Sequence, residues 1–298
     1  VLYNGLLSGV SLSGDRFFYQ NPLESAGDYE RSPWFEVACC PPNMTRFLPS
    51  LPGYVYATRD DVLFVNLFIA GAGEIALPGR TVVLTQETRY PWFGEIRLTV
   101  TPEVEGPFEL ALRVPGWARG EAWPTPLYAF HGAIDERPAL KVNGESAALD
   151  VRDGYARLRR EWRAGDTVEL LLPMPVRRVV ASEAVSEDRG RAALQRGPIV
   201  YAVEGVDNAG RVFGLVLPDA AALGVEYRRD LLGGIVAVTG PAVVISKDAA
   251  GRTVETRQPL LAIPYYAWAN RGPGQMLVWL PRTAAAVRAP VKLDMTID

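Results

Sequence analysis

Residues 95–114 read EIRLTVTPEVEGPFELALRV, and their pattern predicts two β-strands joined by a turn. Apolar and polar residues alternate from Ile96, and the alternation returns at Phe108 after the Glu-Gly-Pro turn at 105–107. Successive side chains of a strand point to opposite faces, so a period of two predicts strands that bury one face. We therefore expect these residues to form half-buried strands of a β-sandwich.

The same period extends along most of the chain, from about residue 55 onward. Asn143-Gly144 and Asp153-Gly154 stand between strand-like runs, and both dipeptides favour the left-handed turns of tight hairpins. A proline-marked break at 173–175 precedes a second strand-rich region. The sequence thus predicts a mainly β chain with a first β-sandwich over 56–175 and a second over 176–298.

Composition and charge exclude several classes of protein. The 298 residues are 48% apolar and 22% charged, which is typical of a globular protein, and 28 glycines with 24 prolines predict many turns. The formal net charge is -3, so no basic excess is present to neutralise phosphates, and we expect no nucleic-acid partner. The apolar runs fall far short of the ~20 residues of a membrane span, so we expect no membrane partner either.

Residues 1–55 differ from the rest, because their apolar spacing is nearer to a helical period. Asn43 is expected to cap a helix over 44–48, which Pro49 would then limit or kink. This segment resembles the end of a helical domain. Further along, residues 116–138 hold His131, the single histidine, and are interpreted as a long loop inserted into the first sandwich.

The adjacent pair Cys39-Cys40, followed by two prolines, is the strongest candidate for chemistry. A disulfide between neighbours would be strained, but two thiolates can share one soft metal ion, for which zinc is the natural candidate. Two buried thiols packed as small apolar groups explain the pair about as well. Zinc needs four ligands, and no spacing pattern links His131 or Glu36 to the cysteines.

Several motifs resemble those of glycoside hydrolase family 127, the β-L-arabinofuranosidase family. The most specific is Ala38-Cys39-Cys40-Pro41-Pro42-Asn43, and the resemblance covers nearly the whole chain. The supporting motifs include LYNG at 2–5, FYQNPLE at 18–24, LPGYVY at 51–56, RVPGW at 113–117, KVNG at 141–144, QRGP at 195–198 and PYYAW at 264–268.

The resemblance implies a fold, a reaction and a set of site residues. The fold would be the last segment of an (α/α)6 barrel, over 1–55, followed by the two β-sandwiches. Cys39 would be the nucleophile of a retaining hydrolase that acts on an arabinofuranoside-type glycoside or oligosaccharide, and Cys40 a zinc ligand. Both sulfurs would then lie at the metal, and Tyr19 would match a tyrosine near the sugar pocket.

The resemblance also implies that the site needs residues upstream of Val1, namely the acid/base glutamate and the remaining zinc ligands. The sequence opens on Val1 rather than Met, and we interpret it as a piece of a longer protein whose isolated chain would be inactive. A bacterial origin and a cytoplasmic location are the default expectations. The alternative is a non-catalytic module that binds glycans or a partner through exposed aromatics such as Trp117, Trp123 and Trp268.

Overall fold

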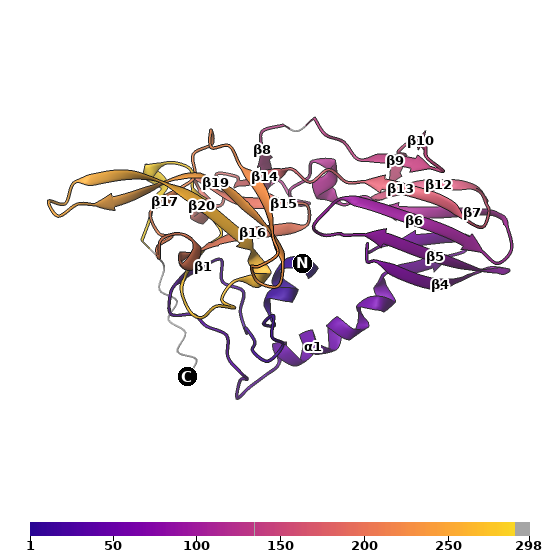
Figure 1. Cartoon of the computed structure of the whole chain (residues 1–298), viewed down its shortest axis with the longest axis horizontal. Coiled ribbons are helices and arrows are strands. Elements are labelled where there is room, and N and C mark those ends of the chain that lie inside the picture. The colour runs from indigo at the N-terminus through magenta and orange to yellow at the C-terminus, as the bar shows by residue number, and fades with distance from the viewer. Residues whose placement is uncertain (134, 290–298) are drawn as a thin grey trace. The chain divides into compact units, whose positions relative to one another are not determined.

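The computed structural model describes residues 1–133 and 135–289, and the chain forms two compact units (Figure 1). The first unit comprises Val1–Thr45, Thr125–His131 and Val176–Asp298, and the second comprises Arg46–Pro124 and Gly132–Pro175. Strands dominate both units, so the predicted mainly β fold is confirmed. The predicted domain limits at 55 and 175 stay predictions. Among the described residues, no helix is long and apolar enough to cross a bilayer.

The second unit is a sandwich of two sheets that bury a common core. One sheet runs in the order β10-β9-β13-β6-β5-β4 and the other in the order β11-β12-β7-β3-β2. The strands are β2 (Tyr56–Arg59), β3 (Val62–Val65), β4 (Gly71–Leu77), β5 (Arg80–Thr88), β6 (Glu95–Pro102), β7 (Gly106–Arg113), β9 (Ala139–Val142), β10 (Glu145–Ala147), β11 (Val151–Arg152), β12 (Tyr155–Trp162) and β13 (Asp166–Leu171).

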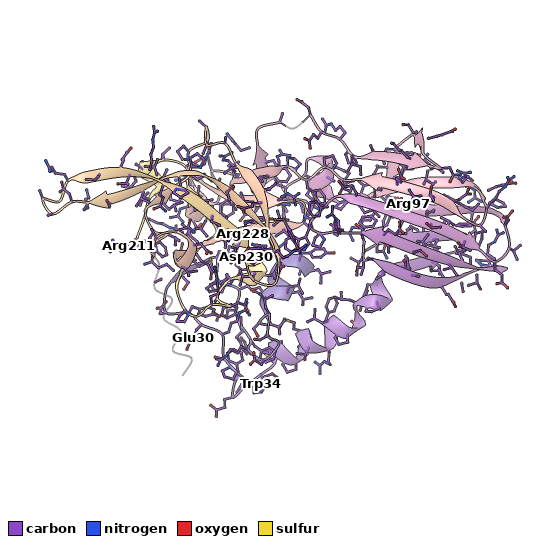
Figure 2. The ribbon with its side chains drawn as sticks, in the orientation of Figure 1. Glu30, Trp34, Arg97, Arg211, Arg228 and Asp230 are labelled. Atoms are coloured by element: carbon purple, nitrogen blue, oxygen red, sulfur yellow. The ribbon has the colours of Figure 1, made fainter. Side chains whose placement is uncertain are left out.

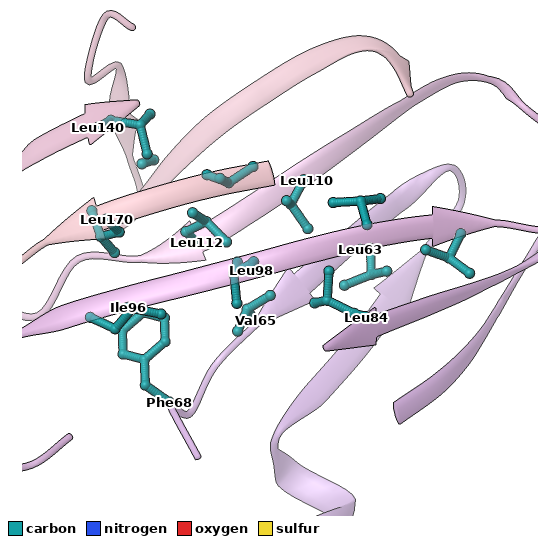
Figure 3. Close-up of a cluster of buried hydrophobic side chains, with 14 of the residues drawn as sticks. Leu63, Val65, Phe68, Leu84, Ile96, Leu98, Leu110, Leu112, Leu140 and Leu170 are labelled. Carbon is teal, nitrogen blue, oxygen red and sulfur yellow. The ribbon is translucent and has the colours of Figure 1, made fainter. Parts of the chain in front are cut away.

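The core of this unit confirms the alternation that begins at residue 95. Leu98 from β6 and Leu110 from β7 are fully buried between the sheets (Figure 3), whereas Arg97 stays exposed and pairs with Glu169 of β13 at 2.6 Å. Trp162 is also fully buried, and its indole nitrogen donates to the Phe108 carbonyl at 3.1 Å. Apolar side chains facing inward from both sheets therefore stabilise the sandwich.

Both predicted tight turns are present. Asn143 and Asp153 each adopt a φ of 52°, and the glycine after each adopts a φ of 81°. These left-handed conformations join β9 to β10 and β11 to β12. The Asn143 side chain also holds the neighbouring strand, because it donates to Asp166 and accepts from the Thr167 amide, each at 2.8 Å.

The first unit is built on one branched network of strands. Its main path runs β17-β19-β20-β16-β15-β14-β8, and β1, β18, β21 and β22 pair beside it. β19 and β20 form a long hairpin that reaches beyond the rest of the sheet (Figure 1). The strands are β1 (Glu24–Ala26), β8 (Tyr128–His131), β14 (Val176–Ala181), β15 (Arg191–Arg196), β16 (Ile199–Glu204), β17 (Leu215–Val216), β18 (Gly224–Arg228), β19 (Ile235–Lys247), β20 (Thr253–Pro264), β21 (Gln275–Leu277) and β22 (Leu280–Pro281).

Two local expectations are wrong. Residues 116–138 are not wholly a loop, because β8 pairs with β14 of the first unit, a long-range pairing that no local pattern signals; residue 134 lies outside the described residues. The helix α1 spans Cys40–Ser50 instead of beginning after Asn43. Pro41 and Pro42 fit its first turn, where amide groups have no partner inside the helix, and the Asn43 side chain donates to the Cys39 carbonyl at 2.8 Å.

We predict that Gly94→Ala destabilises the second unit by about 2 kcal/mol or more, because an added Cβ would overlap the Leu172 carbonyl oxygen. That oxygen belongs to the backbone and cannot swing away as a side chain would. Urea unfolding of the full chain, followed by tryptophan fluorescence, measures the loss. Gly53→Ala is the matched control, since a Cβ there meets no atom within 4 Å. Equal stability of the two variants would contradict the prediction.

Candidate active site

The candidate site lies where α1 begins, within the first unit. Cys39 directly precedes the helix and Cys40 is its first residue, and both thiols are free and exposed. Met44, one turn further along, is buried against Gly9, where an added Cβ would overlap the Met44 side chain. This close approach fixes the start of the helix against residues 1–18, so both cysteines have a defined place.

Tyr19 reaches the cysteines from an extended segment. Phe17 pairs with Val10 and Ser32 on either side, which holds the backbone just before Tyr19. The Tyr19 hydroxyl lies 2.6 Å from Cys39 Sγ, and the Cys39 and Cys40 sulfurs lie 3.6 Å apart. The structure thus brings together all three residues that the sequence analysis selected.

These contacts change the acidity of each group. The hydrogen bond from Tyr19, followed by that from Cys40, lowers the pKa of the Cys39 thiol, because both stabilise its thiolate. The same contact with Cys39 raises the pKa of Tyr19 to about 12. The hydrogen bond with Cys39 raises the pKa of Cys40. These shifts favour the thiolate form at Cys39 over that at Cys40.

The geometry of the two sulfurs fits one shared zinc ion. Two zinc–sulfur bonds of about 2.3 Å at a tetrahedral angle place the sulfurs about 3.8 Å apart, close to the 3.6 Å found here. Across residues 1–133 and 135–289, no group of three or more His, Cys, Asp or Glu side chains is arranged to hold a metal ion. The cysteine pair accordingly offers two of the four positions that zinc requires.

The aromatic residues around the cysteines have different roles. Phe35 packs edge-on against Tyr19, with ring centroids 5.2 Å apart. Trp34 packs edge-on against Phe17, yet 52% of it is exposed beside the start of α1 (Figure 2). Glu36 is exposed as well. Phe35 is thus the aromatic neighbour that steadies the Tyr19 ring.

The tryptophans proposed for a glycan-binding module do not form a common exposed set. Trp268 is fully buried, which contradicts its suggested role. Trp117 is half-buried against the core of the second unit, and only Trp123 of the three is largely exposed, at 53%. His131 lies on β8, with Nε2 3.7 Å from an Asp219 oxygen in the first unit.

The sequence analysis missed residues that hold Tyr19 in place. Phe18 stacks on both Tyr29 and Trp268, and the Arg31 guanidinium lies over the Phe18 ring. Phe18 and Trp268 both fall within motifs already quoted, but nothing in either motif links them across the chain. A cavity of about 370 Å³ opens nearby, lined in part by Ser11, Asp15 and Asn270. The site cysteines do not line it.

The chain thus combines two β-rich units with an adjacent cysteine pair, in the first unit, beside a tyrosine. Comparison with known protein families assigns it to the glycoside hydrolases. Three family models match in order: the GH127 β-L-arabinofuranosidase catalytic domain at residues 1–53, the GH127 middle domain at 62–174 and the family's C-terminal domain at 176–281. The chain belongs to glycoside hydrolase family 127.

Individual relatives agree with this assignment. A non-reducing end β-L-arabinofuranosidase of Bifidobacterium longum subsp. longum is 35% identical over 94% of this chain and 44% of the relative's length. A solved GH127 β-arabinofuranosidase matches with a TM-score of 0.92 and 46% identity, over 97% of this chain and 45% of its own. A GH127 β-L-arabinofuranosidase from Geobacillus stearothermophilus T6 matches with a TM-score of 0.84 and 41% identity, over 94% and 45%. The chain therefore spans less than half the length of each.

We predict that Tyr19→Phe slows alkylation of Cys39 at neutral pH, because the lost hydrogen bond raises the pKa of the thiol and lowers its thiolate fraction. The smaller thiolate fraction should decrease the rate of alkylation by about two- to tenfold. The rate of Cys39 alkylation is measured by mass spectrometry, with iodoacetamide as the reagent and metal-free protein in a Cys40→Ser background. Tyr54→Phe, at an exposed tyrosine, is the control. An unchanged rate in Tyr19→Phe would show that the hydroxyl does not act on the sulfur.

Proposed function

We propose that this chain supplies the cysteine nucleophile and the β domains of a retaining β-L-arabinofuranosidase. The observation that carries the proposal is the 2.6 Å contact between the Tyr19 hydroxyl and Cys39 Sγ, with the second sulfur 3.6 Å away. A retaining hydrolase needs a nucleophile that attacks the sugar and then leaves it. Family membership and the names of the relatives support a glycoside with a β-L-arabinofuranosyl group as the substrate class.

Cys39 carries the first step in this proposal. Its thiolate attacks the anomeric carbon, the bond from that carbon to the leaving oxygen breaks, and the sugar becomes attached to Cys39 Sγ. The leaving oxygen takes up a proton from a proton donor. In the second step a water molecule attacks the same carbon and returns a proton to that donor, and the thiolate is released. Two inversions at one carbon give net retention. The lowered pKa of Cys39 favours both the attack and the departure of the sulfur.

Cys39 and Cys40 are the residues that would hold zinc. Zinc bound by the two sulfurs would keep the thiols deprotonated near neutral pH. The Tyr19 hydroxyl donates to the Cys39 thiolate and directs one of its lone pairs, while Phe35 limits the rotation of the tyrosine ring. We propose that the remaining zinc ligands and the proton donor lie outside this pair, in other parts of the catalytic domain.

We predict that Cys39→Ala in the full-length protein lowers turnover of an aryl β-L-arabinofuranoside by about three orders of magnitude or more, because the variant lacks the sulfur that forms the covalent intermediate in this proposal. In the wild type, acid quenching during turnover should leave the Cys39 peptide heavier by one pentosyl group. Glu36→Gln, at an exposed carboxylate three residues away, should keep activity. A fully active Cys39→Ala variant would rule out the mechanism.

We also predict that the full-length protein purifies with about one zinc per chain. Replacing Cys40 by Ser should lower the zinc content, because serine is a poor substitute for a thiolate ligand. Elemental analysis measures the metal independently of activity, and Glu36→Gln again serves as the control. Undiminished zinc in a protein with both cysteines replaced by serine would exclude these sulfurs as ligands.

A further inference from the structure

We propose that Trp268 and Arg31 are positioning residues, which act through Phe18 and Tyr29 to hold Tyr19 against Cys39. We call Phe18, Tyr29, Arg31 and Trp268 the Trp268 clamp. The expected loss of turnover rests on the proposed function of Cys39. The expected change in the position of Tyr19 and in the alkylation of Cys39 does not rest on it. Through the clamp, Trp268 of the C-terminal β domain (residues 176–281) would help to position a residue of the active site.

The clamp holds the residues on either side of Tyr19. Phe18, just before it, is 4% exposed, and its amide donates to the Gly9 carbonyl at 3.0 Å. Gln20, just after it, contacts the Tyr29 hydroxyl through both backbone groups: its amide donates to that oxygen, and its carbonyl accepts from it, each at 3.3 Å. The backbone of Tyr19 is therefore fixed from both directions.

Three rings form the apolar part of the clamp. The Phe18 ring stacks on Tyr29 at 4.9 Å and on Trp268 at 4.8 Å between centroids, with interplanar angles of 24° and 22°. Tyr29 and Trp268 are themselves 5.9 Å apart. Trp268 is fully buried and comes from the segment that follows β20. Phe18 cannot tilt or slide without losing contacts to both partners.

Arg31 joins the rings to the backbone at both ends of the chain. Its guanidinium carbon lies 4.1 Å from the Phe18 ring centroid. Its terminal nitrogens donate to the Ser8 carbonyl at 2.7 Å and to the Trp268 carbonyl at 3.1 Å, with a weaker contact of 3.3 Å to Tyr266. Burial lowers the pKa of Arg31 to about 10. A planar group with several donors suits this place, and the single ammonium of lysine cannot reproduce the arrangement.

The contact between the Tyr19 hydroxyl and Cys39 Sγ is sensitive to small movements of the Tyr19 backbone. Tyr19 contacts Cys39 only through the end of its side chain, so a small shift of the Tyr19 backbone moves the hydroxyl by a comparable amount. A misplacement of about 1 Å at a reacting group can cost a hundredfold in rate. Removing the Trp268 ring leaves a cavity beside Phe18 into which that ring can move. Tyr19 would then lose its fixed position over the sulfur.

The test compares Trp268→Leu and Trp268→Phe with Trp279→Leu. Trp279 is the matched control, since it is a buried tryptophan of the same unit that stacks on Tyr128 rather than on Phe18. In the full-length protein, Trp268→Leu should lower kcat about 10- to 100-fold per folded molecule, with KM changed less than about threefold. Trp268→Phe keeps a stacked ring and should recover most of kcat.

A second measurement reports on the site without turnover. In the Cys40→Ser background, Trp268→Leu should slow alkylation of Cys39, and adding Tyr19→Phe should then have little further effect, because both changes remove one interaction. Arg31→Lys should also slow the alkylation of Cys39, but by less. This variant replaces Trp268→Leu in the test if Trp268→Leu does not fold. Unchanged alkylation in folded Trp268→Leu and Arg31→Lys would overturn the clamp. Altered alkylation with kcat unaffected would keep the clamp and reject Cys39 as the nucleophile.

Discussion

The buried guanidinium of Arg31 is the interaction on which the site depends. Burying a cation costs free energy that hydrogen bonds to its donors offset. Here the backbone carbonyls of Ser8 and Trp268 accept from the terminal nitrogens, whereas the buried Nε has no hydrogen-bond partner among the described residues. These carbonyls belong to opposite ends of the sequence, so the terminal nitrogens have both partners only when both ends are in place. Local order in the first 45 residues and folding of the C-terminal β domain are thereby coupled.

Side-chain amides extend this coupling along the N-terminal segment. Asn4 donates to the Pro198 carbonyl at 2.9 Å and accepts from the Val200 amide at 2.8 Å, as a neighbouring strand would. The Leu12 amide donates to the Asn270 side chain at 2.8 Å. The segment has little regular structure of its own, and these contacts supply partners that its backbone would otherwise lack. The segment is therefore packed with the C-terminal strands in one compact unit.

Much of the fold could be predicted because its signals are local. The alternation at Leu98 and Leu110 and the Asn143-Gly144 turn each depend on a few adjacent residues, and the structure confirms them. The pairing of β8 with β14 could not be predicted, because its energy comes from residues far apart in the sequence. The start of α1 was misjudged for another reason. Asn43 was expected to cap the helix, whereas Pro41 and Pro42 already occupy the first turn, where proline is tolerated.

In the candidate site, too, the features with a local sequence signal could be predicted, and those that depend on distant residues could not. Cys39 and Cys40 are adjacent, so chemistry between them can be inferred from sequence alone, and Tyr19 was reached only through the family resemblance. Nothing local distinguishes Trp268 from any other tryptophan, since its role depends on contact with Phe18. In the proposed function, the nucleophilic sulfur lies at the exposed start of a helix, where the helix backbone alone does little to orient it. The packing of Phe18, next to Tyr19, on the fully buried Trp268 provides that orientation. In this proposal the C-terminal β domain therefore contributes directly to the geometry of the catalytic segment.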